Sequence, residues 1–268
     1  MISRGKRNVL GVSVDVIDYE SAVDQIIDAA KSKHPFAVTA LAVHGVMTGA
    51  MDPEQRFRLN QFDLVVPDGQ PVRWALNLLH SADLSERVYG PTLMLKLCER
   101  SAKEGLPIYL YGSNTGVLSK LRQRLLSSFP SIKIAGTQPS RFRRITADEK
   151  KEIVQQIRDS GARLVFAGLG CPRQEVWAYE YREALSLPVV AVGAAFDFHA
   201  GTVPQAPDAL QSAGLEWAYR LSKEPGRLWR RYALLNPLYL AMITAQATGL
   251  RNFDTSPGTR PAHEMNYG

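Results

Sequence analysis

The feature that most constrains the fold is an alternation of short apolar runs with longer amphipathic segments. Runs such as Val9–Val16, Phe36–Leu41 and Arg163–Ala167 have the length and composition of strands, and a segment with helical periodicity follows each of them. Strands that alternate with helices are typical of a parallel sheet with helices on both faces. We therefore expect an α/β core over residues 1–200, with its last strand at Pro188–Val192.

The pattern changes after about Phe198. Residues 201–250 combine helical periodicity with basic and aromatic side chains, which predicts a basic amphipathic helical appendage. Within it, the uncharged stretch Tyr232–Leu250 approaches the length of a membrane span, but Pro237 and several polar residues favour a helix that lies in the membrane interface. Residues 251–268 have little apolar content, and we expect them to be disordered.

Composition limits the cellular compartments and the kinds of partner that the protein is expected to have. Two cysteines among 268 residues do not make a disulfide framework, so we expect a cytoplasmic protein. The first ten residues lack the apolar run of a signal peptide. The net charge of +6 suits an anionic partner, which could be nucleic acid, nucleotide phosphates or an acidic membrane surface, although solubility alone could also explain it. The five histidines show no metal-ligand spacing, and we expect no metal site.

Ligands of an open parallel sheet bind beyond the carboxyl ends of the strands, so residues that directly follow strands are the best candidates for a site. The first of them is Asp68, in the turn Pro67-Asp68-Gly69. A carboxylate in that position can act as a general base towards an acceptor hydroxyl. A turn-forming or helix-capping role is the alternative.

Two loops with glycine connect a strand to a helix in the same way. Small residues allow backbone N–H groups to approach a phosphate at a helix N-terminus, while an ordinary structural connection is the alternative for both loops. The candidate ligand-binding residues of the two loops are Gly112, Ser113, Asn114, Gly168, Gly170, Arg173 and Gln174. Cys171 has no histidine near it in sequence, which argues against a nucleophilic role.

Several segments, taken together and in their order along the chain, resemble motifs of the WecG/TagA/CpsF glycosyltransferases. These segments are Val65–Gly69, Glu86–Gly90, Leu110–Ser113, Gly168–Glu175, Val192–Gly201 and Gly214–Leu221. The resemblance covers about residues 9–235 and implies a Rossmann-like catalytic core. It also implies an inverting transfer, without metal or other cofactor, from a UDP-sugar to a saccharide on a polyprenyl diphosphate.

The resemblance further implies roles for individual residues. Asp68 falls at the position of the catalytic base. Thr39 and Gln174 fall where polar side chains line the pocket, and Arg87 matches a motif arginine beside it.

The appendage of such enzymes is expected to dock on the inner face of the plasma membrane and to deliver an arginine to the diphosphate. Arg220 matches that arginine best, with Arg227 and Arg230 as neighbours. Arginines and helix N-termini would stabilise the charge of the leaving UDP without a metal, and the chain has no Asp-x-Asp pair to hold one.

Two departures from the family pattern leave the donor sugar open. Leu41 stands where an asparagine is usual, and Thr92 where an aspartate is frequent. The donor can therefore carry N-acetylmannosamine, glucose or a uronic acid. We expect a UDP-sugar, a lipid-linked acceptor and an anionic membrane surface as partners, and no nucleic acid; homo-oligomerisation stays open.

Two other functions fit parts of the sequence. A Rossmann-type sugar-nucleotide oxidoreductase or epimerase would need Gly-x-Gly-x-x-Gly after the first strand, where this chain lacks it. A non-enzymatic membrane adaptor would use the basic C-terminal helices but would leave the strand-end motifs unexplained.

Overall fold

The computed structural model describes residues 1–256 and 258–268, except for the side chains of Arg227 and Arg231. Its centre is a six-stranded sheet in the order β4-β3-β8-β7-β5-β6, and every pair of neighbouring strands is parallel. The strands are β3 (Phe36–Leu41), β4 (Leu64–Pro67), β5 (Ile108–Gly112), β6 (Ile134–Gln138), β7 (Leu164–Gly168) and β8 (Pro188–Ala191). The expected α/β fold with a parallel sheet is confirmed.

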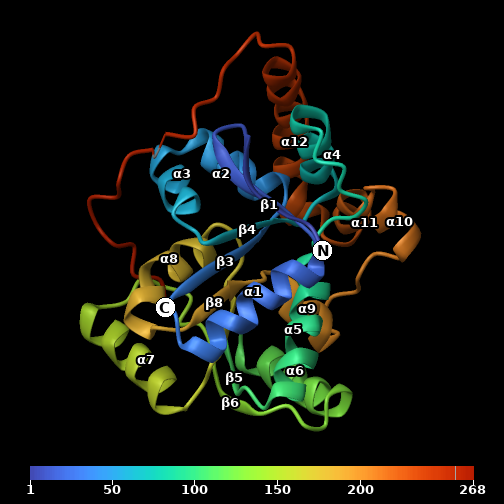
Figure 1. Ribbon diagram of the computed structural model, residues 1–268. Helices are drawn as coiled ribbons and strands as arrows, with labels where there is room; N and C mark the ends of the chain where they lie inside the picture. The colour runs from blue at the N-terminus through green and yellow to red at the C-terminus, as the bar shows by residue number, and fades with distance from the viewer. Residues whose placement is uncertain (257) are drawn as a thin grey trace.

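Helices cover both faces of the sheet, because alternate strand residues point to opposite sides (Figure 1). Phe166 and Val190 belong to one apolar core, whereas Val165 and Val189 belong to the other. The first core is closed by α1 (Tyr19–Ser32), α5 (Gly90–Glu104), α6 (Thr115–Ser128) and α9 (Ala195–Ala200). The second is closed by α2 (Val43–Met51), α3 (Pro53–Asn60), α4 (Gln70–His80), α7 (Ala147–Asp159), α8 (Arg173–Leu185) and α12 (Pro225–Ala247).

The chain leaves the carboxyl ends of the neighbouring strands β3 and β8 towards opposite faces of the sheet, because α2 packs in one core and α9 in the other. It runs outward from β3 to the edge strand β4, crosses the sheet to β5, runs out to the other edge at β6, and returns through β7 to β8, which pairs with β3. Open α/β sheets bind ligands at the carboxyl ends of strands whose connections separate in this way. Asp68 directly follows β4, and Gly193 lies just beyond β8. The topology therefore places Asp68 beside the expected crevice.

An antiparallel hairpin of β1 (Ser3–Val9) and β2 (Val12–Ile17) precedes the sheet, where the sequence pattern favoured a single strand. The hairpin lies next to β4, and a side chain of β2 accepts a hydrogen bond from a backbone N–H on the open edge of β4. The Val65 N–H donates to Asp15 Oδ2 at 2.7 Å, and Asp15 is 7% exposed. Burial raises the pKa of Asp15 to about 6, although the Val65 N–H and Lys6 act in the opposite direction.

Asp15→Asn should stabilise the protein by about 1 kcal/mol at pH 8, because it removes a buried charge and keeps an oxygen for Val65. The folded protein holds a proton on Asp15 up to about pH 6, above the unfolded value of 3.8, so the wild type loses stability as pH rises through this window. The gain should vanish near pH 4. Urea unfolding at both pH values measures it, and Asp15→Leu, which leaves the Val65 N–H without an acceptor, should destabilise at both.

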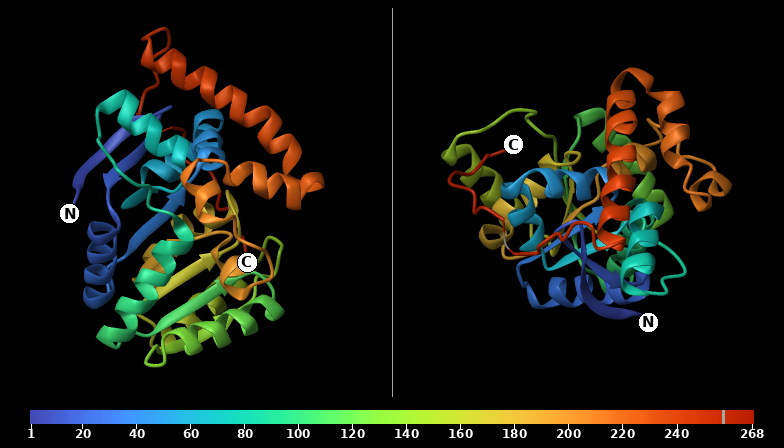
Figure 2. Two further views of the ribbon diagram at one scale, coloured as in Figure 1. Left: turned by 90° about the vertical axis from the view of Figure 1, so that its right-hand side faces the viewer. Right: turned by 90° about the horizontal axis from the view of Figure 1, so that it is seen from above.

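Three helices follow the core: α10 (Asp208–Ser212), α11 (Glu216–Lys223) and the 23-residue α12. The second half of α12, the long orange-to-red helix in Figure 2, lies against α2 and α4. Tyr239 and Ile243 are buried there, and the Tyr239 hydroxyl donates to the Pro71 carbonyl at 3.0 Å. Among the described residues, no helix combines the length and hydropathy needed to cross a bilayer.

The segment for which composition predicts disorder, residues 251–268, runs back over the core (Figure 1). Its described part contains no helix, and it contacts the core through both backbone and side-chain hydrogen bonds. The Ile145 N–H donates to the Asn266 carbonyl at 2.8 Å, and Ser140 Oγ donates to the Gly268 carbonyl at 2.7 Å. The end of the segment thereby lies beside the loop that follows β6.

Candidate active site

The centre of the site is Asp68, which the fold holds at the meeting point of three strand ends. Its backbone N–H donates to the Leu41 carbonyl at the end of β3. Its Oδ1 accepts the Gly90 N–H at 2.6 Å. A Cβ on Gly90 would lie 3.0 Å from Ala40 Cβ and 3.7 Å from the carbonyl oxygen of Val192, so the missing side chain allows this close approach.

The surroundings of Asp68 suit a base that works near neutral pH. Burial of the carboxyl group raises the pKa of Asp68 to about 6, and the Glu216 carboxylate acts in the same direction. The Arg87 and Arg220 guanidinium groups and the Gly90 N–H oppose this shift. A carboxyl group with such a pKa is largely ionised at pH 7 and is a better proton acceptor than an ordinary aspartate.

Arg87 lies beside Asp68, and its charge is already paired. Its Nη2 donates to Glu216 Oε2 at 2.9 Å and to Gln211 Oε1 at 3.0 Å, and its guanidinium lies 4.0 Å from the centre of the Tyr89 ring. The Tyr89 hydroxyl donates to Glu216 Oε1 at 3.0 Å. Glu216 and Tyr89 stand inside motifs that carry the family resemblance, but neither they nor Gln211 could be given a role from the sequence.

Of the three appendage arginines, Arg220 is the one that lies close enough to Asp68 to lower the pKa of its carboxyl group, among the described side chains. It lies on α11, influences the pKa of Asp68, and places its guanidinium 5.7 Å from the centre of the Phe198 ring. Arg230 is exposed on α12, and its described contact is with the neighbouring Trp229 ring. The side chain of Arg227 lies outside the described residues.

Thr39 and Gln174 come together, but in a buried network around Glu175. Thr39 Oγ1 and Gln174 Nε2 donate to the same Glu175 oxygen at 3.0 and 2.9 Å, and the Gly170 N–H donates to Gln174 Oε1 at 3.1 Å. Thr39, Gln174 and Glu175 are at most 3% exposed, and burial raises the pKa of Glu175. In this structure the network holds the loop after β7, and sequence reasoning missed Glu175, its common acceptor.

The two loops with glycine pack against each other. The Ser113 N–H donates to the Gly168 carbonyl at 2.9 Å, and a Cβ on Gly112, whose φ is +117°, would lie 2.6 Å from that oxygen. Asn114 caps α6 by accepting the Val117 N–H. These contacts are what a structural connection requires.

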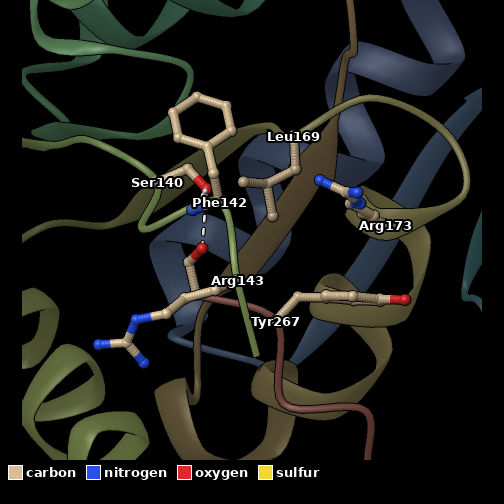
Figure 3. Close-up of a pocket in the computed structure, with 7 residues that line it drawn as sticks. Ser140, Phe142, Arg143, Leu169, Arg173 and Tyr267 are labelled. Atoms are coloured by element: carbon tan, nitrogen blue, oxygen red, sulfur yellow. Dashed lines mark hydrogen bonds between the residues drawn. The ribbon is translucent and has the colours of Figure 1, made fainter. Parts of the chain in front are cut away.

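The C-terminal segment lies against the second of these loops (Figure 3). A cavity of about 10 Å³ remains between them, lined by Ser140, Phe142, Arg143, Leu169, Arg173, Tyr267 and Gly268. The Arg173 guanidinium lies 5.7 Å from the centre of the Tyr267 ring. Arg173 therefore points towards this segment, and a ligand at Arg173 would have to share the space with Tyr267.

The described residues include no cluster of three or more histidine, cysteine, aspartate or glutamate side chains arranged to hold a metal. The site offers a partly desolvated carboxylate with two arginines nearby. Comparison with protein families matches residues 7–252 to the model described as the glycosyl transferase WecG/TagA/CpsF family.

Proposed function

Because the chain belongs to the WecG/TagA/CpsF glycosyltransferase family, we propose that it transfers a sugar from a UDP-sugar, with inversion, to a saccharide on a polyprenyl diphosphate. The family implies a sugar-nucleotide donor and an acceptor. The observation that supports this reaction is the setting of Asp68, a carboxylate whose pKa is raised to about 6 beside Arg87 and Arg220.

In the proposed reaction Asp68 takes the proton from the acceptor hydroxyl. The hydroxyl oxygen forms a bond to the anomeric carbon while the bond from that carbon to the UDP oxygen breaks. Attack from the face opposite UDP inverts the configuration. UDP leaves with the electron pair and growing negative charge; in this proposal Arg220 stabilises that charge without a metal, while Arg87 is already paired with Glu216.

The proposal places the protein in the cytoplasm, peripherally bound to the inner face of the plasma membrane, where a lipid-linked acceptor resides. Support comes from large apolar side chains that α11, α12 and the residue before α11 leave exposed. These are Leu215, Trp217, Trp229, Leu234, Leu238 and Leu240. Exposed aromatic and apolar groups beside arginines are typical of a helix that lies in a lipid interface.

Incubation with UDP-linked N-acetylmannosamine, glucose or a uronic acid and a polyprenyl-diphosphate saccharide should release UDP with at least one donor. Activity should persist in EDTA, because arginines neutralise the leaving group. UDP should also raise the melting temperature, and NAD should not. Stabilisation by NAD would favour an oxidoreductase, and loss of activity in EDTA that Mg²⁺ or Mn²⁺ restores would refute metal independence.

A further inference from the structure

We propose that Glu216 is a positioning residue that fastens α11 to the catalytic core through Arg87 and Tyr89, and thereby holds Arg220 beside Asp68. The inference rests on the proposed function for its effect on turnover. The attachment of α11 to the core through Glu216 does not depend on which reaction the protein catalyses.

The fastening uses both oxygens of one carboxylate. Glu216 Oε2 accepts from Arg87 and Oε1 accepts from the Tyr89 hydroxyl. Tyr89 immediately precedes Gly90, whose N–H binds Asp68, and Arg87 stands three residues before Gly90. Glu216 is therefore connected to Asp68 through a single short segment of the core.

The pair is more desolvated than an ordinary surface ion pair. The side chains of Arg87 and Glu216 are 10% and 15% exposed. Loss of one partner from such a pair leaves a shielded charge uncompensated, which costs much more than the loss of an exposed pair. Gln211 on α10 adds a second acceptor for Arg87, at 3.0 Å.

Apolar burial does not fix α11 by itself. The helix has eight residues, and none of them is buried. Glu216 and Arg220 are four residues apart, so they lie on the same face of the helix one turn from each other. Fixing Glu216 against Arg87 consequently fixes the direction of Arg220, whose guanidinium then lies against the Phe198 ring.

The charges around Asp68 agree with this arrangement. Arg87 and Arg220 lower the pKa of Asp68, whereas Glu216 raises it. The hydroxyl groups of Tyr19 and Tyr89 also face this cluster. Burial is the main cause that raises the pKa of both tyrosines, and nearby carboxylates add to it. Glu216 thus neutralises Arg87 while the Arg220 charge stays available one turn away.

The test compares Glu216→Ala with Asp208→Ala, which removes an exposed carboxylate from the neighbouring helix α10. In Glu216→Ala, hydrogen exchange of the backbone amides of residues 216–223 should become faster. The affinity for UDP should stay within about 3-fold of the wild-type value. Turnover should fall about 10-fold or more, because Arg220 is misplaced. Asp208→Ala should leave all three unchanged. Glu216→Gln, which keeps one acceptor, should show a smaller effect and serves if the alanine variant does not fold.

A double-mutant cycle separates positioning from general stabilisation. If Glu216 acts through Arg220, Glu216→Ala should cause little further loss of turnover in an Arg220→Ala background. Additive losses, or unchanged amide exchange in Glu216→Ala, would overturn the inference. If the wild type transfers no sugar at all, the proposed function fails, and the exchange experiment still decides whether Glu216 fastens α11.

Discussion

Replacing Asp68 with asparagine should lower the rate of sugar transfer by about 10²-fold or more, while the protein still folds and binds UDP. Asparagine cannot take a proton from the acceptor hydroxyl. Its Oδ1 can still accept the Gly90 N–H that Asp68 accepts at 2.6 Å, so the local structure should persist. Single-turnover kinetics together with UDP titration separates the loss of chemistry from a loss of binding.

The pH profile gives a second measurement on the same variant. A base must be deprotonated to work, so kcat/KM of the wild type should rise with pH through about 6 and then level off. Asp68→Asn should lose this rise.

Asp63 provides the matched control for Asp68→Asn. It precedes β4, whereas Asp68 follows it, and Asp63 also accepts a backbone N–H, from Ala37 at 2.7 Å. Asp63→Asn should keep near-normal turnover. Near-normal turnover in Asp68→Asn would remove this residue from the mechanism.

The combined change Leu234→Ser and Leu238→Ser should weaken binding to anionic lipid vesicles by about 100-fold, since burying each leucine side chain contributes about 1.5–3 kcal/mol. These leucines are 66% and 40% exposed and lie one helical turn apart on α12. Sedimentation with phosphatidylglycerol vesicles measures the effect. Turnover on a lipid-linked acceptor should fall, whereas UDP binding should not.

Phe142→Ser is the control, because Phe142 is 62% exposed but follows β6 at the opposite edge of the sheet from β4. Unchanged vesicle binding in the double-leucine variant would mean that this face does not meet lipid. Deletion of the appendage is a poorer test, since it would also remove Leu228, Tyr239 and Ile243, which are buried.

The parallel α/β core could be predicted because each strand is a short apolar run with its own flanking turn. The hairpin was missed because Val9–Val16 reads as one continuous run. The structure turns at Leu10 and Gly11, which both have positive φ, as the central residues of a tight hairpin turn do. The glycine was the available signal. Strand order had no such signal, since the insertion of β8 between β3 and β7 depends on packing across the whole sheet.

For the site, sequence reasoning identified charged residues but not what pairs with them. Asp68, Arg87 and Arg220 stand in motifs, and the structure relates all three electrostatically. Glu216 and Glu175 could not be assigned, because Arg87, Tyr89 and Thr39, which donate to them, come from segments more than a hundred residues away along the chain. The same holds for residues 251–268, whose composition gives no sign of the backbone hydrogen bonds that they make with the core.

The two attachments of the C-terminal helices have a geometric consequence. Glu216 ties α11 to the core beside Asp68, and Tyr239 ties α12 to the start of α4. Leu234 lies between these ties and is 66% exposed. If this face rests on a bilayer, Asp68 stands at a set height above the lipid surface. That fixed height would select acceptors by the distance of their reacting hydroxyl from the membrane surface.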